Sequence, residues 1–180
     1  MNKLTNDMES EPKDLIVLGA IKNGITKFDK IKKTTQIDPE ELNAILEKLE
    51  ERGLITVNEK KGWFGTKVEI VATDKGKKEV DERVHELQEK WNQMSLIYKT
   101  GDKEKLKQYM DDNKSFLPTM MFFGIMDIMM FSMMFSMMGM MMTDYVPQES
   151  IPDGIDGSGG AEADGGGDLG DGGFDIDIGF

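Results

Sequence analysis

The sequence contains no cysteine and only one histidine, His85. Without thiols the chain cannot form a disulfide, a zinc–cysteine cluster or a cysteine nucleophile. His85 falls outside the apolar pattern of its own segment, so we assign it no chemistry. The sequence also offers no nucleophile paired with a base, no set of metal ligands and no phosphate-binding glycine loop between a strand and a helix. We therefore expect no catalysis, no cofactor and no metal.

Lysine and arginine are absent after residue 115, although the chain has 22 of them. Residues 116–180 hold 11 of the 34 acidic residues and so account for nearly all of the net charge of −12. The part before them is close to neutral. The acidity therefore describes the C-terminal part and says little about the folded domain.

With 180 residues the chain has room for one modest domain with appendages. The N-terminus has no apolar core, so we predict no secretory signal peptide and expect the folded part in the cytoplasm. The composition divides the chain into a flexible N-terminus (1–11), a helical and hairpin domain (12–73), a long helix with a short charged helix (74–114), an apolar helix (116–142) and a disordered acidic tail (143–180).

Residues 116–142, which we name the methionine-rich segment, contain 12 of the 16 methionines and one charged residue, Asp127. Read as one helix, the segment is apolar on every side, as in a buried or membrane helix. At about 1.5 Å per residue it would be about 40 Å long, enough to cross a hydrocarbon layer of about 30 Å.

Three interpretations of this helix stay open. The first is a membrane anchor, for which the distribution of lysine and arginine places the N-terminal side in the cytoplasm. The second is a surface that holds hydrophobic protein segments, favoured by the charge of Asp127 and by flexible methionine in place of leucine. The third is a plain core or oligomer helix. The residues expected to contact a membrane or a partner are Phe122, Phe123, Ile125, Ile128, Phe131, Phe135, Met137 and Met138.

The domain before this segment has the signals of three helices and a hairpin. Apolar residues between Pro12 and Ile21 predict a first helix, and residues 27–35 predict a short basic one. Asp38, Pro39 and Glu41 predict the capped start of a third helix, which Gly53 ends. Residues 54–57 and 66–72 predict two strands around a polar turn. The fold class is therefore mainly α with a small β-hairpin.

This order of elements resembles the winged helix-turn-helix domain of archaeal and bacterial regulators of the broad MarR/PadR type. The resemblance rests on L-E-K-L-E-E-R-G-L-I at 46–55, E-K-K-G-W-F-G at 59–65 and A-T-D-K-G-K-K-E-V at 72–80. It covers about residues 12–85 and implies that the helix at 38–52 would be the recognition helix, placed in a DNA groove. The candidate DNA-binding residues are Lys27, Lys30, Lys32, Lys33, Asn43, Lys48, Arg52, Lys60, Lys61 and Trp63.

The charge of that recognition helix opposes DNA binding. Residues 38–52 contain six acidic residues against Lys48 and Arg52. Affinity for nucleic acid depends largely on cations that displace counterions from phosphates. A winged helix that binds protein is therefore the main alternative.

Residues 74–98 predict a long amphipathic helix. Its apolar residues recur in steps of four and three, which is the spacing of a coiled-coil seam. We predict a homodimer through this seam, and a helix packed across its own domain is the alternative. The seam residues are Val80, Val84, Leu87, Trp91, Met94 and Tyr98.

The acidic, glycine-rich tail has a composition that favours disorder. Its last seven residues differ, because Phe174, Ile176, Ile178 and Phe180 alternate with Asp175 and Asp177. Such a segment fits a docking motif or an added strand. A simple solubilising tail is the alternative.

Two functional hypotheses follow. In the first the chain is a dimeric, DNA-binding regulator held at the membrane by its methionine-rich helix. In the second it is an adaptor or holdase whose winged helix binds protein and whose methionines hold hydrophobic segments of partners.

Overall fold

The computed structural model describes residues 4–62, 65–148 and 151. These residues form a mainly helical chain with one small antiparallel hairpin. The helices and strands are α1 (Leu4–Lys22), α2 (Phe28–Thr35), α3 (Pro39–Glu51), β1 (Ile55–Gly62), β2 (Gly65–Ala72), α4 (Asp74–Thr100), α5 (Lys103–Asp112), η1 (Lys114–Phe116), α6 (Leu117–Phe122), α7 (Ile128–Met138) and η2 (Met142–Asp144).

The predicted order of three helices, a hairpin and a long helix is confirmed, with small shifts of the ends. The helix α1 begins at Leu4 rather than at Pro12, so Pro12 lies inside it. Asp38 occupies the cap position of α3, but its side chain accepts no capping hydrogen bond. The predicted capping box is therefore wrong, and Glu41 instead accepts hydrogen bonds of 2.7 and 2.9 Å from Lys13 of α1.

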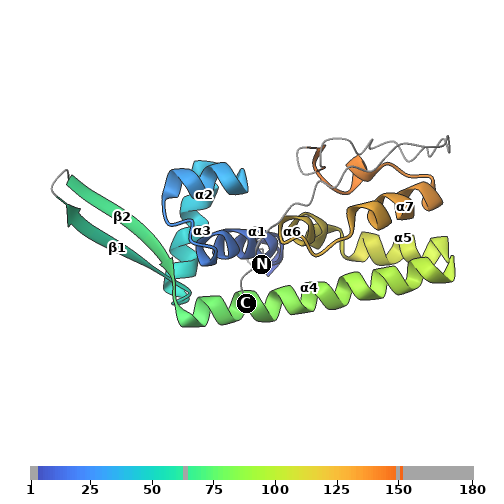
Figure 1. Cartoon of the computed structure of the whole chain (residues 1–180), viewed down its shortest axis with the longest axis horizontal. Coiled ribbons are helices and arrows are strands. Elements are labelled where there is room, and N and C mark those ends of the chain that lie inside the picture. The colour runs from blue at the N-terminus through green and yellow to red at the C-terminus, as the bar shows by residue number, and fades with distance from the viewer. Residues whose placement is uncertain (1–3, 63–64, 149–150, 152–180) are drawn as a thin grey trace, which may run out of the picture.

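The hairpin extends away from one end of the molecule (Figure 1). Its strands pair from Ile55 opposite Ala72 to Gly62 opposite Gly65. Its base is fixed to the loop between α1 and α2, because the backbone N–H of Ile70 donates to the carbonyl of Thr26 at 2.8 Å. Residues 63 and 64 lie outside the described part of the chain, so the expectation for Trp63 stays a prediction.

The long helix α4 runs along the molecule and connects its two ends (Figure 1). α1 and α6 pack on its middle, and α5 folds back on its C-terminal part and contacts α7. Gly101, at a φ of 75°, ends α4 two residues beyond the predicted end at residue 98. The alternative interpretation of the seam, a helix packed across its own domain, thus describes the arrangement within one chain.

The assignment of the seam to a dimer contact needs correction. Leu87 is 3% exposed, Trp91 8% and Met94 0% within the single chain, and Val80 is buried as well. Val84 and Tyr98 are half-buried. The heptad spacing marks a face that the chain's own α1, α5 and α6 cover, and dimerisation itself stays a prediction.

The methionine-rich segment is not one helix, so the prediction of a single apolar helix over residues 116–142 is wrong. It folds as α6, a turn, α7 and η2. Gly124 and Gly139, at φ values of 63° and 70°, end the two helices. Asp127, the charge inside the apolar run, caps α7 and accepts a hydrogen bond of 2.9 Å from the Met130 N–H. The aspartate therefore breaks the run and begins the second helix.

The break changes the membrane interpretation. α7 has 11 residues and α6 has 6, whereas a span needs about 20. Among the residues that the structure describes, no helix is long and apolar enough to cross a bilayer. The predicted spanning anchor is therefore not supported.

Candidate binding surfaces

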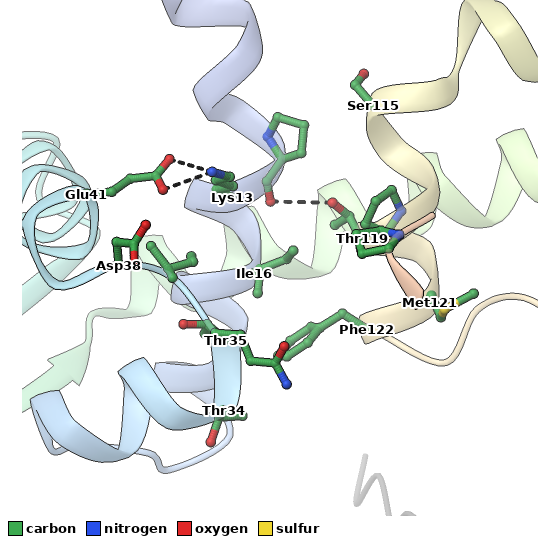
Figure 2. Close-up of a pocket in the computed structure, with 15 residues that line it drawn as sticks. Lys13, Ile16, Thr34, Thr35, Asp38, Glu41, Ser115, Thr119, Met121 and Phe122 are labelled. Carbon is green, nitrogen blue, oxygen red and sulfur yellow. Dashed lines mark hydrogen bonds and ion pairs between the residues drawn. The ribbon is translucent and has the colours of Figure 1, made fainter. Parts of the chain in front are cut away.

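A groove of about 670 Å³ lies between α1, the end of α2 and α6 (Figure 2). Ile16 of α1, Ile37 after α2 and Phe122 of α6 contribute its apolar lining. The Lys13–Glu41 ion pair stands at one side of it. The buried Thr119 hydroxyl, 3.5 Å from the carbonyl oxygen of Pro12, joins α6 to α1 beside the groove. This groove could not be predicted from sequence, because its residues come from four separate segments.

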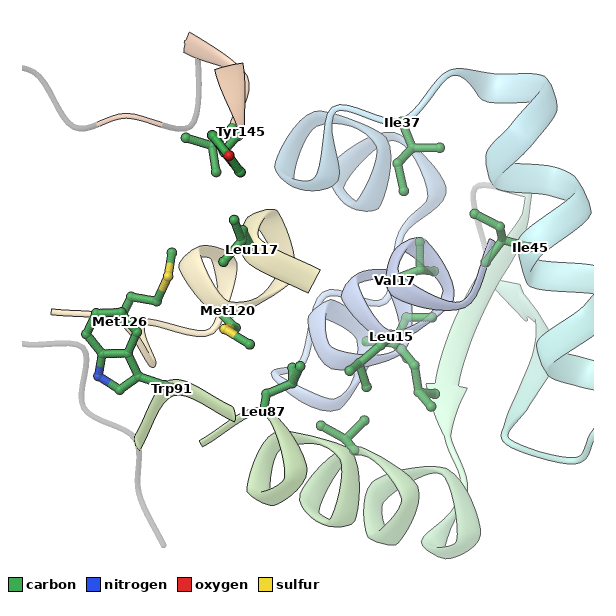
Figure 3. Close-up of a cluster of buried hydrophobic side chains, with 14 of the residues drawn as sticks. Leu15, Val17, Ile37, Ile45, Leu87, Trp91, Leu117, Met120, Met126 and Tyr145 are labelled. Atoms are coloured by element: carbon green, nitrogen blue, oxygen red, sulfur yellow. The ribbon is translucent and has the colours of Figure 1, made fainter. Parts of the chain in front are cut away.

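The inner face of the methionine-rich segment is a packed core. Trp91 meets Phe131 edge to face at 6.3 Å, and Phe131 meets Phe135 at 4.9 Å. Phe135 in turn lies 5.2 Å from the ring of Tyr145. Figure 3 shows the side chains of α1, α4 and α6 that extend this core toward the first helix. The aromatic series fixes α7 on α4.

Tyr145 closes this core with a polar contact. Its hydroxyl donates a hydrogen bond of 2.5 Å to the Asp111 carboxylate of α5. Burial, and then the bond to Asp111, raises the pKa of Tyr145 to about 12. Hydrogen bonds from Lys107 and then from Tyr145 hold the pKa of Asp111 below its usual range. At neutral pH the phenol is therefore a donor and the carboxylate an acceptor, which holds the chain after α7 on α5.

The outer face of α7 exposes methionine. Met129 is 66% and Met133 51% exposed, and Met137 follows in the same row of the helix, half-buried. No residue of α7 is charged. We name these three residues the methionine face. Exposed apolar side chains that lie next to one another on a rigid element are typical of binding surfaces, whereas single ones are not.

The residues predicted to contact a membrane or a partner divide between core and surface. Phe131 is 0% and Phe135 1% exposed, so their assignment to a contact surface is wrong. The others are half-buried, namely Phe122, Phe123, Ile125, Ile128, Met137 and Met138. Met129 and Met133 were missed. Phe131 and Phe135, four apart, share one face of α7, and Met129 and Met133 lie on the opposite face. Because both faces are apolar, the spacing alone does not show which of them is buried.

Four of the candidate DNA-binding lysines gather on α2 and at its N-cap position. Lys27, Lys30, Lys32 and Lys33 are all exposed, on a stretch of chain whose one acidic residue is Asp29. The structure gives these lysines no ion pair within the described residues. They form a basic surface beside the groove, which we name the α2 lysines.

Three of the candidate cations on α3 and the hairpin form ion pairs within the chain. Lys48 pairs at 2.9 Å with Asp14, a carboxylate of α1 that is 3% exposed. Arg52 pairs with Glu79 at 2.5 Å, and Lys60 pairs with Glu69 at 2.6 Å. Asn43 and Lys61 are exposed. The cations of α3 thus join helices within the chain, while its exposed side keeps most of its acids.

Comparison with models of protein families, with curated proteins and with solved structures gives no match.

Proposed function

We propose that this protein is a binding protein without catalytic activity, which holds an apolar helical segment of another protein on its methionine face. The observation that carries the proposal is the exposure of Met129 and Met133, one turn apart on an uncharged helix. Water contact of this apolar surface costs free energy, and a partner that covers it recovers about 25 cal/mol per Å².

The chemistry of methionine suits this role. Its unbranched side chain adapts to partners of different shape, and its sulphur is polarizable. The phenylalanines on the inner side of α7 hold the helix in place, so that the methionines outside it can rearrange without loss of the fold. The surface therefore combines a rigid support with adaptable contacts.

The domain that carries this surface is, in our proposal, a winged helix. The order α1, α2, α3, β1, β2 and α4 supports that assignment, and so does the tight packing of the hairpin base on α1. The acidic exposed side of α3 and the internal use of Lys48 and Arg52 favour a winged helix that joins proteins over one that reads DNA with α3.

The proposal is tested with the full chain and a fluorescent, uncharged amphipathic peptide that bears leucine on one helical face. Met129→Gln with Met133→Gln keeps side-chain size and helix propensity but removes the apolar surface. We expect the double variant to bind the peptide about tenfold more weakly, which corresponds to about 1.4 kcal/mol. Fluorescence anisotropy measures this change.

The matched control is Leu96→Gln, which changes another residue that is 55% exposed but lies on α4. Its binding should equal that of the unaltered chain. An equal loss of peptide affinity in both variants would show nonspecific hydrophobic binding rather than a site. Unchanged peptide affinity of the double variant would contradict the proposal.

A second candidate function is nucleic-acid binding through the α2 lysines. The observation that favours it is their shared exposure on one short helix. A helix of this charge would contact phosphates and add little base specificity.

For this second function we expect Lys32→Glu with Lys33→Glu to weaken binding of a 20-base-pair duplex and to reduce its salt dependence. Each lost phosphate contact lowers the slope of log K against log salt by about one unit. Anisotropy at several salt concentrations measures the slope. Lys103→Glu with Lys105→Glu, on the exposed side of α5, is the control of equal charge. Equal effects of the two double substitutions on duplex affinity, or an affinity that does not depend on salt concentration, would contradict the assignment.

A further inference from the structure

The groove between α1, α2 and α6 is separate from the methionine face, and nothing in the proposed function uses it. We propose that it binds residues 174–180 of the same chain, F-D-I-D-I-G-F. The observations that support this occupant are the apolar lining of the groove and the short distance along the chain from the groove to the segment.

The apolar chemistry of the groove and of the segment agree. Met121 and Phe122 of α6, together with Ile16 of α1, provide the lining. In an extended chain alternate side chains point to the same side. Phe174, Ile176, Ile178 and Phe180 would then face the groove together. Its volume of about 670 Å³ is that of a site for a few large side chains.

The last described residues lie close to the groove. Pro147 lines it, the Ile151 N–H donates to the carbonyl of Gln148 at 3.1 Å, and residues 152–173 connect that point to the segment. These 22 residues are rich in glycine. A glycine-rich chain of this length has a root-mean-square span of about 26 Å, from about 5–6 Å times the square root of its length. The segment can therefore return to the groove, at an effective concentration on the order of millimolar.

The edge of the groove is balanced in charge. A shallow recess at the end of α2 shares Gln36 and Ile37 with the groove and includes Lys32 and Lys33. Asp29 and Asp38 lie in the same recess, so its charges cancel. The affinity for the segment therefore comes from the apolar contacts, and Asp175 and Asp177 would lie on the opposite side of the extended segment.

The absence of cysteine gives a direct test in the full chain, because introduced thiols are the only ones present. Gly179→Cys places one thiol in the segment. Each of three variants adds a second thiol, by Thr34→Cys at the groove, by Thr66→Cys on β2 or by Gln88→Cys on α4. All three sites are exposed. A short bismaleimide then joins thiols within reach, and mass spectrometry follows the rate.

We expect cross-linking to position 34 to be at least about fivefold faster than to position 66 or 88, as a tethered site in the millimolar regime requires. The rate should not change on dilution. Replacing Phe174, Ile176, Ile178 and Phe180 by serine should reduce it to that of the other positions, with no effect on the folded part.

Three results would overturn the inference. Equal rates at all positions mean that the segment has no site on this chain. Preference for position 66 means strand addition at the hairpin, and a product that forms only between two chains means that the occupant comes from a second copy. None of these results affects the peptide binding of the methionine face, so the two proposals fail independently.

Discussion

Phe131→Ala should lower the free energy of unfolding by about 3–5 kcal/mol, the usual cost of removing a large buried aromatic side chain. Phe131 is 0% exposed and contacts both Trp91 of α4 and Phe135 of its own helix. The cavity would open between the two helices that hold the methionine face in place. Guanidinium unfolding measures the change as a lower midpoint at an unaltered slope.

The control for this prediction is Met133→Ala, two residues along the same helix. Met133 is 51% exposed, so its loss should change the stability by no more than about 0.5 kcal/mol. The two variants distinguish support of the fold from the proposed contact: Phe131→Ala should lower stability, and Met133→Ala should weaken the proposed peptide binding without that loss. Similar stabilities of both variants would mean that α7 does not pack on Trp91 as the structure has it.

The helices of the N-terminal domain were predictable because their apolar residues alternate with charged ones. In α3 the buried set of Leu42, Ile45, Leu46 and Leu49 follows directly from its spacing. The hairpin was likewise predicted from two strand-like segments around a polar turn. Where polar and apolar residues contrast, the period alone identifies the buried face.

The methionine-rich segment lacks that contrast, which is why its fold was not predicted. With apolar residues on every side, no period distinguishes Phe131, buried, from Met129, exposed. The signals that divide the segment were present as Gly124, Asp127 and Gly139. We interpreted Asp127 as a charge that a bilayer would penalise, whereas it caps a helix. An aspartate three residues before a free backbone N–H is a common helix start, and here it outweighs the length of the run.

The surfaces were harder to predict than the elements. The steps of four and three along α4 indicate a contact face but do not state whether the contact lies within the chain or between chains. Cations such as Lys48 and Arg52 look available in the sequence, and their ion pairs with Asp14 and Glu79 depend on contacts between distant segments. Prediction of binding residues therefore requires the tertiary structure, even where the helices can be predicted from the sequence alone.

Gly76→Ala should destabilise the protein by about 2–3 kcal/mol, although alanine in a helix is normally better than glycine by about 1 kcal/mol. A Cβ atom at position 76 would lie 2.0 Å from the carbonyl oxygen of Leu54 and 2.9 Å from its carbonyl carbon. These are backbone atoms at the start of the hairpin, and Thr73 binds the same turn through its hydroxyl. The first turn of α4 would have to move away from the hairpin base. Thermal and guanidinium unfolding measure the loss.

The matched variant is Gly19→Ala, at the other buried helical glycine with a close neighbour. A Cβ atom there would lie 2.4 Å from Cζ of Phe123, the far end of a half-buried side chain. That ring can turn aside toward solvent, so we expect a loss of about 1 kcal/mol or less. A larger cost for Gly19→Ala than for Gly76→Ala would show that the contact of α6 with α1 is more rigid than the contact of α4 with the hairpin base. The difference between the two variants therefore tests whether the base of the hairpin is fixed to α4 through backbone contact.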